Sequence, residues 1–154
     1  MAVYKILLPY NFSPMDQKAL DFIIRTYQGR KDVEMTLFHS YTPIPEIDTD
    51  SSTVMVRLSS SMQFLSQQLK EKEEKLESRR AYLSRSGFAE NCVDYIFRPR
   101  GRPVADEIIH TVKQGGYDVV VLSCRAYRIT RVFIQSVHEK VISSLKDTAI
   151  CIVT

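Results

Sequence analysis

Short apolar runs alternate with longer amphipathic segments along the whole chain. Nearly continuous apolar residues occupy 3–8, 33–40, 93–97, 118–122 and 149–153, as is typical of strands covered on both faces. Between these runs, apolar residues recur every three or four positions, which indicates helices. Strands joined by helices run parallel, with right-handed crossovers. We therefore predict one α/β domain over residues 1–154, with three α/β/α layers and a five-stranded parallel sheet.

Capping residues mark the ends of the predicted helices. Ser13 is a candidate N-cap, with Pro14 at the first helical position and Asp16 in the first turn, near the positive end of the helix dipole. Gly29 is expected to close this helix. The other helices are predicted to end at Ser86-Gly87, to span 103–114 before Gly115-Gly116, and to span 136–145.

The longest predicted helix follows a polar, proline-containing loop at 42–52. Its apolar residues fall close to a heptad stripe, and the charged run KEKEEK at 70–75 supplies a solvated face. The stripe comprises Leu58, Met62, Leu65, Leu69, Leu76 and Leu83. This pattern predicts one continuous apolar face along the helix.

Composition and charge are those of an ordinary globular protein. The net charge of +3 is too small to indicate nucleic-acid binding by itself, and no aromatic interleaving accompanies the basic residues. The basic excess lies in residues 79–154, which hold 12 Lys and Arg against 7 Asp and Glu. Most of this excess is arginine, which favours an anion site in the second half of the chain.

Three cysteines and the N-terminal segment indicate the cellular compartment in which the protein works. Cys92, Cys124 and Cys151 show no CxxC spacing, which argues against a disulfide framework or a zinc site and favours small core residues in a reducing cytoplasm. The N-terminal apolar run contains one early lysine and is interrupted by Pro9, which predicts a strand and not a signal peptide. No apolar run approaches the roughly 20 residues that cross a bilayer, so no membrane association is expected.

Motifs of catalysis are missing from the sequence. His39, His110 and His138 are scattered, and the latter two are expected to be solvent-exposed. There is no GxSxG elbow, and neither GxxxxGK[ST] nor GxGxxG is present. We therefore predict that the protein is not an enzyme and holds no metal.

Two features could bind an anion. Ser136 stands at a predicted helix N-terminus, where backbone N–H groups bind phosphate, although it can also simply cap its own helix. Two βα loops, expected at the same sheet edge, carry arginines whose planar fork suits phosphate or carboxylate. These are Arg98, Arg100 and Arg102 in one loop, and Arg125, Arg128 and Arg131 in what we predict to be the neighbouring one. The alternative is a solvated basic rim that pairs with acids such as Glu107.

Five motifs in order resemble those of the universal stress protein family. They are ILLPYNFSPMDQKAL at 6–20, TLFHS at 36–40, GRPVADEI at 101–108, DVVVL at 118–122 and QSVHEKVISSLKDTAICIVT at 135–154. The resemblance covers essentially the whole chain. It implies an adenine-nucleotide α-hydrolase-like, Rossmann-like topology. It also implies a homodimer formed through the last strand, with Ala149, Ile150, Cys151, Ile152 and Val153 at the interface.

The resemblance also bears on ligands. The ATP-binding branch of the family carries G-x2-G-x9-G-[ST] after the fourth strand. Here Ser123, Ala126 and Gln135 stand in place of the glycines, the last spacing is one residue shorter, and only Ser136 is retained. Glycine permits positive φ and close approach of the backbone to phosphate. The family's aspartate after the first strand is Asn11 here. This sequence is therefore similar to the branch without the motif, so ATP or AMP is disfavoured and no cofactor is predicted.

Two functional hypotheses follow. The first is a cytoplasmic, non-catalytic, dimeric regulatory protein of the stress response. The second is a sensor of a nucleotide or another small phosphorylated ligand, in which Arg125 and Arg128 replace the lost glycine N–H groups. The residues expected at such a site are Pro9, Asn11, Ser40, Ser123, Arg125, Ala126, Arg128, Gln135, Ser136 and Val137.

Overall fold

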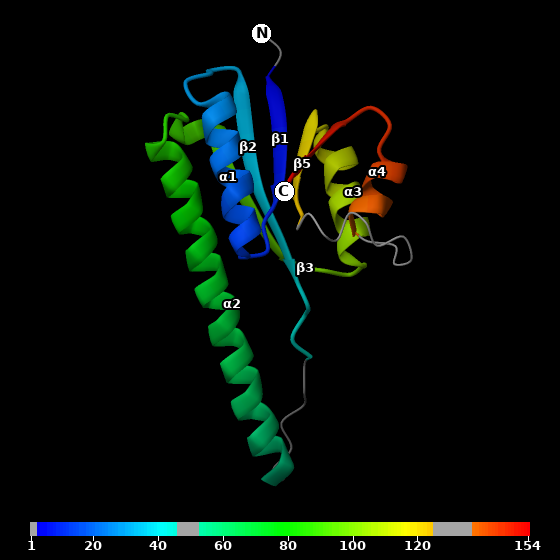
Figure 1. Ribbon diagram of the computed structural model, residues 1–154. Coiled ribbons are helices and arrows are strands. Elements are labelled where there is room, and N and C mark those ends of the chain that lie inside the picture. Colours follow the sequence, from blue (N-terminus) through cyan, green and yellow to red (C-terminus); the bar gives the residue numbers. More distant parts are fainter. Residues whose placement is uncertain (1–2, 46–52, 125–136) are drawn as a thin grey trace.

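The computed structural model describes residues 3–45, 53–124 and 137–154. Five strands alternate with four α-helices in the predicted order, and most boundaries lie within two residues of those expected (Figure 1). The elements are β1 (Tyr4–Pro9), α1 (Pro14–Tyr27), β2 (Val33–Tyr41), α2 (Thr53–Arg85), β3 (Val93–Pro99), α3 (Val104–Gly115), β4 (Val119–Ser123), α4 (Val137–Ser144) and β5 (Ala149–Val153), with a short 3₁₀ turn at Glu90–Cys92.

The sheet is parallel throughout, in the order β3-β2-β1-β4-β5. Helices α1 and α2 cover one face, and α3 and α4 cover the other (Figure 1). The predicted three-layer α/β fold is therefore confirmed. Strand order reverses between β1 and β4, which is where ligands bind in open parallel sheets. One expectation was wrong: the loops after β3 and β4 are not neighbours, because β2 and β1 lie between those strands.

Alternating side chains of the strands build a core on each face. On one face, Ile6 and Leu8 pack with Leu20 and Ile23 of α1. On the other, Leu7 packs with residues of α3 and α4, among them Ile108, Val112 and Val141. All of these side chains are nearly or fully buried. Burial on both faces is what produces the continuous apolar runs of the strands.

The capping signals of the sequence are present. Ser13 is the N-cap of α1 and forms a capping box with Asp16. Gly29 and Gly116 adopt left-handed backbone angles, φ +79° and +61°, at the ends of α1 and α3. Each closes its helix in a conformation that costs glycine little.

The apolar stripe of α2 divides into two parts. Leu76 and Leu83 are fully buried, whereas Leu58 and Leu65 remain 40% and 43% exposed. A helix of 33 residues is about 50 Å long, and the longest strand of nine residues only about 30 Å. The N-terminal part of α2 therefore runs past the sheet (Figure 1). The expected continuous core-facing stripe is wrong for this part of the helix.

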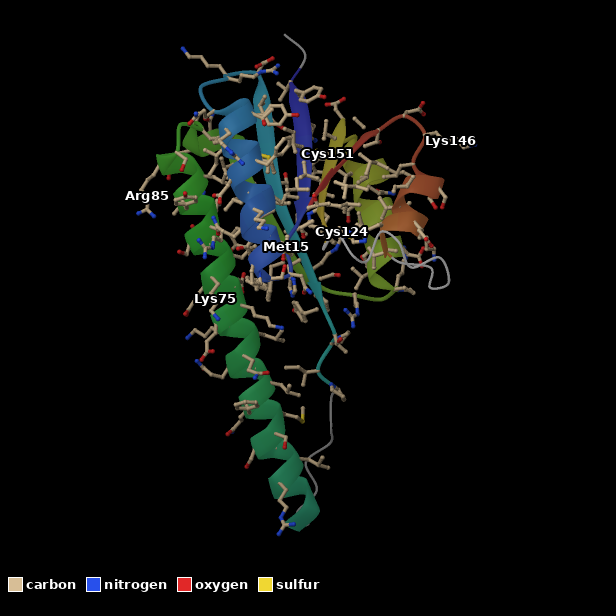
Figure 2. All side chains as sticks on the ribbon, in the orientation of Figure 1. Met15, Lys75, Arg85, Cys124, Lys146 and Cys151 are labelled. Carbon is tan, nitrogen blue, oxygen red and sulfur yellow. The ribbon has the colours of Figure 1, made fainter. Side chains whose placement is uncertain are left out.

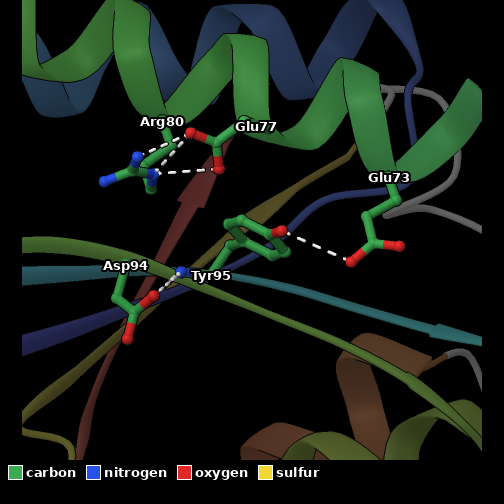
Figure 3. Close-up of polar contacts among 5 residues, drawn as sticks. All are labelled: Glu73, Glu77, Arg80, Asp94 and Tyr95. Atoms are coloured by element: carbon green, nitrogen blue, oxygen red, sulfur yellow. Dashed lines mark hydrogen bonds and ion pairs between the residues drawn. The ribbon is translucent and has the colours of Figure 1, made fainter.

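Polar contacts join the C-terminal half of α2 to the edge strand β3 (Figure 3). The Tyr95 hydroxyl donates to a Glu73 carboxylate oxygen at 3.3 Å, and the Tyr95 N–H donates to Asp94 Oδ1 at 2.7 Å. Beside them, Arg80 and Glu77 pair within α2 at 2.6 Å. Of these three contacts, the bond between Tyr95 and Glu73 links α2 to β3, whereas the other two lie within one element each. Such exposed contacts contribute little stability.

The cysteines are free thiols. Cys124 is buried at the end of β4, as expected, while Cys92 and Cys151 are only half-buried (Figure 2 labels Cys124 and Cys151). Within the described part of the chain, no helix is both long and apolar enough to span a membrane.

Candidate functional site

The crevice between the carboxyl ends of β1 and β4 is the first candidate site. Met15, at the start of α1, and Cys124, after β4, both lie at this edge of the sheet (Figure 2). Polar groups from three places lie at this crevice: the β1–α1 turn, the end of β4 and the start of α4. Among the described residues, no group of three or more His, Cys, Asp or Glu could hold a metal ion.

Asp16 is the centre of the crevice. Its carboxylate is 3% exposed and accepts bonds from the N–H groups of Asn11 and Ser13, at 2.9 and 3.0 Å. It also accepts from the hydroxyls of Ser13, at 2.8 Å, and of Ser123, at 2.6 Å. A buried carboxylate needs such donors to offset the loss of water. Asp16 therefore ties the β1–α1 turn to the end of β4.

His138 of α4 closes the same crevice from the other side. Its Nε2–H donates to the backbone carbonyl of Ser123 at 2.8 Å, and the residue is half-buried. The expectation that His138 is solvent-exposed is therefore wrong, and His110 is half-buried as well. Both histidines lie on helices that pack against the sheet, so few positions on these helices are fully exposed to solvent.

A cavity lies on the other side of β1, at the end of β2 and beneath the middle of α2. Its volume is about 390 Å³. The floor comes from Asn11 and from residues 39–42 at the end of β2, and the sides from α2 and from the segment after β2. Leu65, Leu69 and Lys72 of α2 line it, and Arg100 of the β3–α3 loop faces it. We call this cavity the α2 pocket.

Ser40 is among the residues around the α2 pocket, but its hydroxyl does not open into it. The Oγ atom is buried and has no hydrogen-bond partner among the described residues. Ser40 shares the strand face of Phe38, which packs in the core beneath α3 and α4. A buried hydroxyl without a partner costs free energy. The role of Ser40 as a ligand residue stays a prediction.

Aromatic rings stand behind the pocket. His39 stacks on Phe97 with ring centres 5.6 Å apart, and it meets the edge of Phe12 at 5.0 Å. Phe12 adopts φ +59°, a left-handed conformation that is uncommon for a large side chain and orients its ring between Tyr10 and His39. A turn strained in this way persists only where the surrounding structure holds it.

His39 is held neutral in this cluster. Burial lowers its pKa, the charges of Lys72 and Arg100 lower it further, and the bond to the Tyr10 carbonyl and the charge of Asp16 oppose this. The Nδ1–H donates to that carbonyl at 2.8 Å, so Nε2 is left as an acceptor in the neutral ring. Because the folded-state pKa is depressed, the unfolded chain takes up a proton first as the pH falls, and acidification opposes folding.

The model of the universal stress protein family matches residues 3–148. The chain belongs to the universal stress protein family. No curated protein matches it closely.

Solved structures of this family have the same fold. The hypothetical protein MJ0577 aligns with a TM-score of 0.69 and 22% identity, over 99% of this chain and 96% of that one. The universal stress protein UspA from Lactobacillus plantarum gives 0.66 and 15%, over 100% and 99%. The universal stress protein from Archaeoglobus fulgidus in complex with dAMP gives 0.61 and 13%, over the whole of both chains. At these identities the likeness establishes the fold.

The predicted site residues of this universal stress protein divide into three groups. Asn11 and Ser123 meet at the crevice through Asp16, while Pro9, half-buried, ends β1 beside them. Ser40 is among the residues around the α2 pocket. Val137 is the first residue of α4 and is 36% exposed. Arg125, Ala126, Arg128, Arg131, Gln135 and Ser136 lie outside the described residues.

The arginines after β3 do not act as one cluster. Arg98 donates to Thr111 at 2.6 Å and pairs with the buried Glu107 at 3.4 Å, as the alternative of a paired basic rim predicted. Glu107 also accepts the Gly101 N–H, so it shapes the loop. Arg100 instead reaches Thr42, at 2.7 Å, on the rim of the α2 pocket. Arg98 and Arg100 thus have different partners, and anion binding by the arginine loops stays a prediction.

Two functional features escaped prediction. The role of Asp16 as an acceptor was missed, although Ser13-Pro14-Met15-Asp16 carries the S-x-x-D pattern of a capping box. Lys72 is exposed, as the solvated face predicts, and it also lines the pocket, which was not predicted. The alternating charges around it hide this position from any sequence pattern.

Proposed function

We propose that this universal stress protein is a non-catalytic regulatory protein of the stress response that does not bind ATP in the manner of the glycine-motif branch. The observation that supports this most directly is the bond from the Ser123 hydroxyl to Asp16 at 2.6 Å. Ser123 stands in place of the first signature glycine, and this bond commits its side chain to Asp16 of the same protein. Asp16 also brings a negative charge into the crevice where phosphate would lie, and like charges repel.

Dimerisation through β5 is part of the proposal. In the described sheet β5 pairs with β4 alone, so its other side is a free edge. The strand is short and apolar, with Ile152 38% exposed, and it carries no charged residue that would prevent edge pairing. A two-fold axis beside β5 would join the two sheets into one. The free cysteines fit a reducing cytoplasm as the working compartment.

A nucleotide sensor is the second candidate. It draws support from the solved relative from Archaeoglobus fulgidus in complex with dAMP. In this chain the phosphate partners would be Arg125 and Arg128.

Thermal unfolding in the presence of nucleotides separates the two candidates. With several millimolar ATP or AMP and Mg²⁺, we expect the melting temperature to stay within about 1 °C of the ligand-free value. A nucleotide present at 100 times its Kd would instead stabilise the fold by about 2.7 kcal/mol, or a rise of several degrees. Such a rise, abolished by Arg125→Ala, would establish the sensor in place of our proposal.

Light scattering tests the dimer. We expect the wild-type protein to have the mass of two chains, and Ile152→Lys to have the mass of one, because a buried lysine at the joint would repel its copy. Ile142→Lys is the matched control: this isoleucine is also exposed, at 47%, but lies on α4. A monomeric wild type at high concentration rules out the β5 dimer.

A further inference from the structure

The described sheet ends in β3 on one side and in β5 on the other. Along a strand, successive residues turn their N–H and C=O groups to opposite sides within the plane of the sheet. The Arg100 N–H, directly after β3, donates to the Tyr41 carbonyl of β2 at 2.8 Å. Even-numbered residues of β3 therefore face β2, and odd-numbered residues turn their backbone groups to the free side. We call these the outward positions of β3; they are Val93, Tyr95, Phe97 and Pro99.

Three of these four outward positions offer no N–H group to a further strand. The Val93 N–H donates to a carbonyl of the preceding 3₁₀ turn. The Tyr95 N–H donates to Asp94 Oδ1 at 2.7 Å (Figure 3). Pro99 has no N–H at all. Among the outward positions, Phe97 alone keeps an N–H for which the described part of the chain provides no acceptor.

The outer side of β5 differs from that of β3. The Ala149 N–H donates to the Asp118 carbonyl, directly before β4, at 2.9 Å. Odd-numbered residues of β5 therefore face β4, and Ile150 and Ile152 turn their N–H groups outward. No strand of the described sheet pairs with this side. One edge of the sheet is thus open to a partner strand, and the other is nearly closed.

Asp94 is the residue whose side chain closes the middle of the β3 edge. Aspartate is disfavoured in strands, and here it interrupts the apolar run of 93–97. It is exposed, so packing does not require an acid at this position. Its bond to the Tyr95 N–H occupies the donor that an incoming strand would use, and its negative charge would repel the carbonyl oxygens of that strand.

We propose that Asp94 closes the β3 edge to a second copy of this chain and so restricts strand pairing between molecules to β5. A sheet with one open edge ends at two chains, because pairing about a two-fold axis uses the open edge of both. A sheet with two open edges would continue from chain to chain. Closure of β3 stands by itself, whereas the limit of two chains rests on the β5 dimer proposed above.

The decisive variant is Asp94→Val, which removes the acceptor and places a strand-forming side chain at the same position. It is made in the wild-type chain and in Ile152→Lys, where β5 is blocked. In the Ile152→Lys chain, we expect Asp94→Val to double the mass measured by light scattering, from one chain to two. In the wild-type chain, we expect masses above two chains that grow with protein concentration.

Two control variants separate the hydrogen bond from charge and from added apolar surface. Asp94→Asn keeps an acceptor oxygen without the charge, so its mass should equal that of its parent chain. Glu74→Val adds an exposed valine to helix α2, where no strand can pair, and it should not associate either. Asp94 and Glu74 are both exposed, and a thermal melt of each variant verifies folding.

Amide hydrogen exchange locates the contact. In the wild-type protein, relative to intrinsic rates, we expect the Tyr95 amide to exchange about tenfold more slowly than the Phe97 amide, because only the former is bonded. In dilute Asp94→Val this difference should disappear. At concentrations where Asp94→Val associates, both amides should become protected.

Three results would contradict closure of β3 by Asp94. The first is that Asp94→Val keeps the mass of its parent chain in both backgrounds. The second is that Asp94→Asn associates as strongly as Asp94→Val, since charge and not the bond would then close the edge. The third is that Glu74→Val associates equally. A monomeric wild type would instead count against the β5 dimer alone, and Asp94→Val should then form two-chain species in either background.

Discussion

Replacing Asp16 by asparagine is expected to lower the free energy of unfolding by about 2–4 kcal/mol. Four donors converge on this carboxylate, from Asn11, Ser13 and Ser123. An amide offers one oxygen in place of two and turns an N–H₂ group toward donors, so at least one buried donor loses its partner. Urea unfolding of the two proteins measures the difference.

Asp21→Asn is the matched control for this change. Asp21 lies on the same helix, and among the described residues its side chain accepts one hydrogen bond, from Gln17, four residues earlier, at 3.1 Å. Pairs of this kind are worth about 0.2–0.5 kcal/mol, so the control should remain near wild type. If both variants lose the same stability, the crevice bonds do not hold β1 to β4.

Leu76→Ala is expected to have the second large effect, a loss of about 2–5 kcal/mol in the free energy of unfolding. The Leu76 side chain is fully buried in the core between α2 and the sheet, so its removal leaves a cavity. Leu65→Ala, the same change eleven residues earlier on the same helix, should cost less than about 1 kcal/mol because Leu65 is 43% exposed.

Comparing these two leucines by chemical denaturation tests how α2 is divided. Equal losses would mean that the N-terminal half of the helix packs as firmly as the C-terminal half. That outcome would restore the continuous apolar face that the heptad stripe predicts, and it would remove the pocket wall at Leu65.

Local patterns account for most of the fold. The apolar runs identify the strands: β1, β2 and β4 are mostly buried on both faces, and the edge strands β3 and β5 keep an apolar run although they are partly exposed. Ser13, Gly29 and Gly116 mark helix ends through backbone geometry. The heptad stripe of α2 misleads because periodicity records which side chains share a face. It does not record where the sheet beneath them ends.

The candidate sites are less accessible to sequence reasoning. Asn11 and Ser123 follow from their places at strand ends, but the bond that organises the crevice joins Ser123 to Asp16, 107 residues away. Lys72 and Arg100 both line the α2 pocket although they come from α2 and from the loop after β3, the edge strand of the sheet. Contacts between residues far apart in the sequence follow from the order of the strands, and no short sequence motif predicts them.

A chain of hydrogen bonds runs through Asp16 and links several strand ends. Asn11 faces the α2 pocket and donates to Asp16, Asp16 accepts from Ser123, and the Ser123 carbonyl accepts from His138, while the next residue, Cys124, bonds the end of β5. The turn after β1 and the dimer edge proposed at β5 are thus joined by one chain of bonds. A ligand that changed the affinity of one β5 for another through Asp16 would by necessity have its own affinity changed by the same factor on dimerisation.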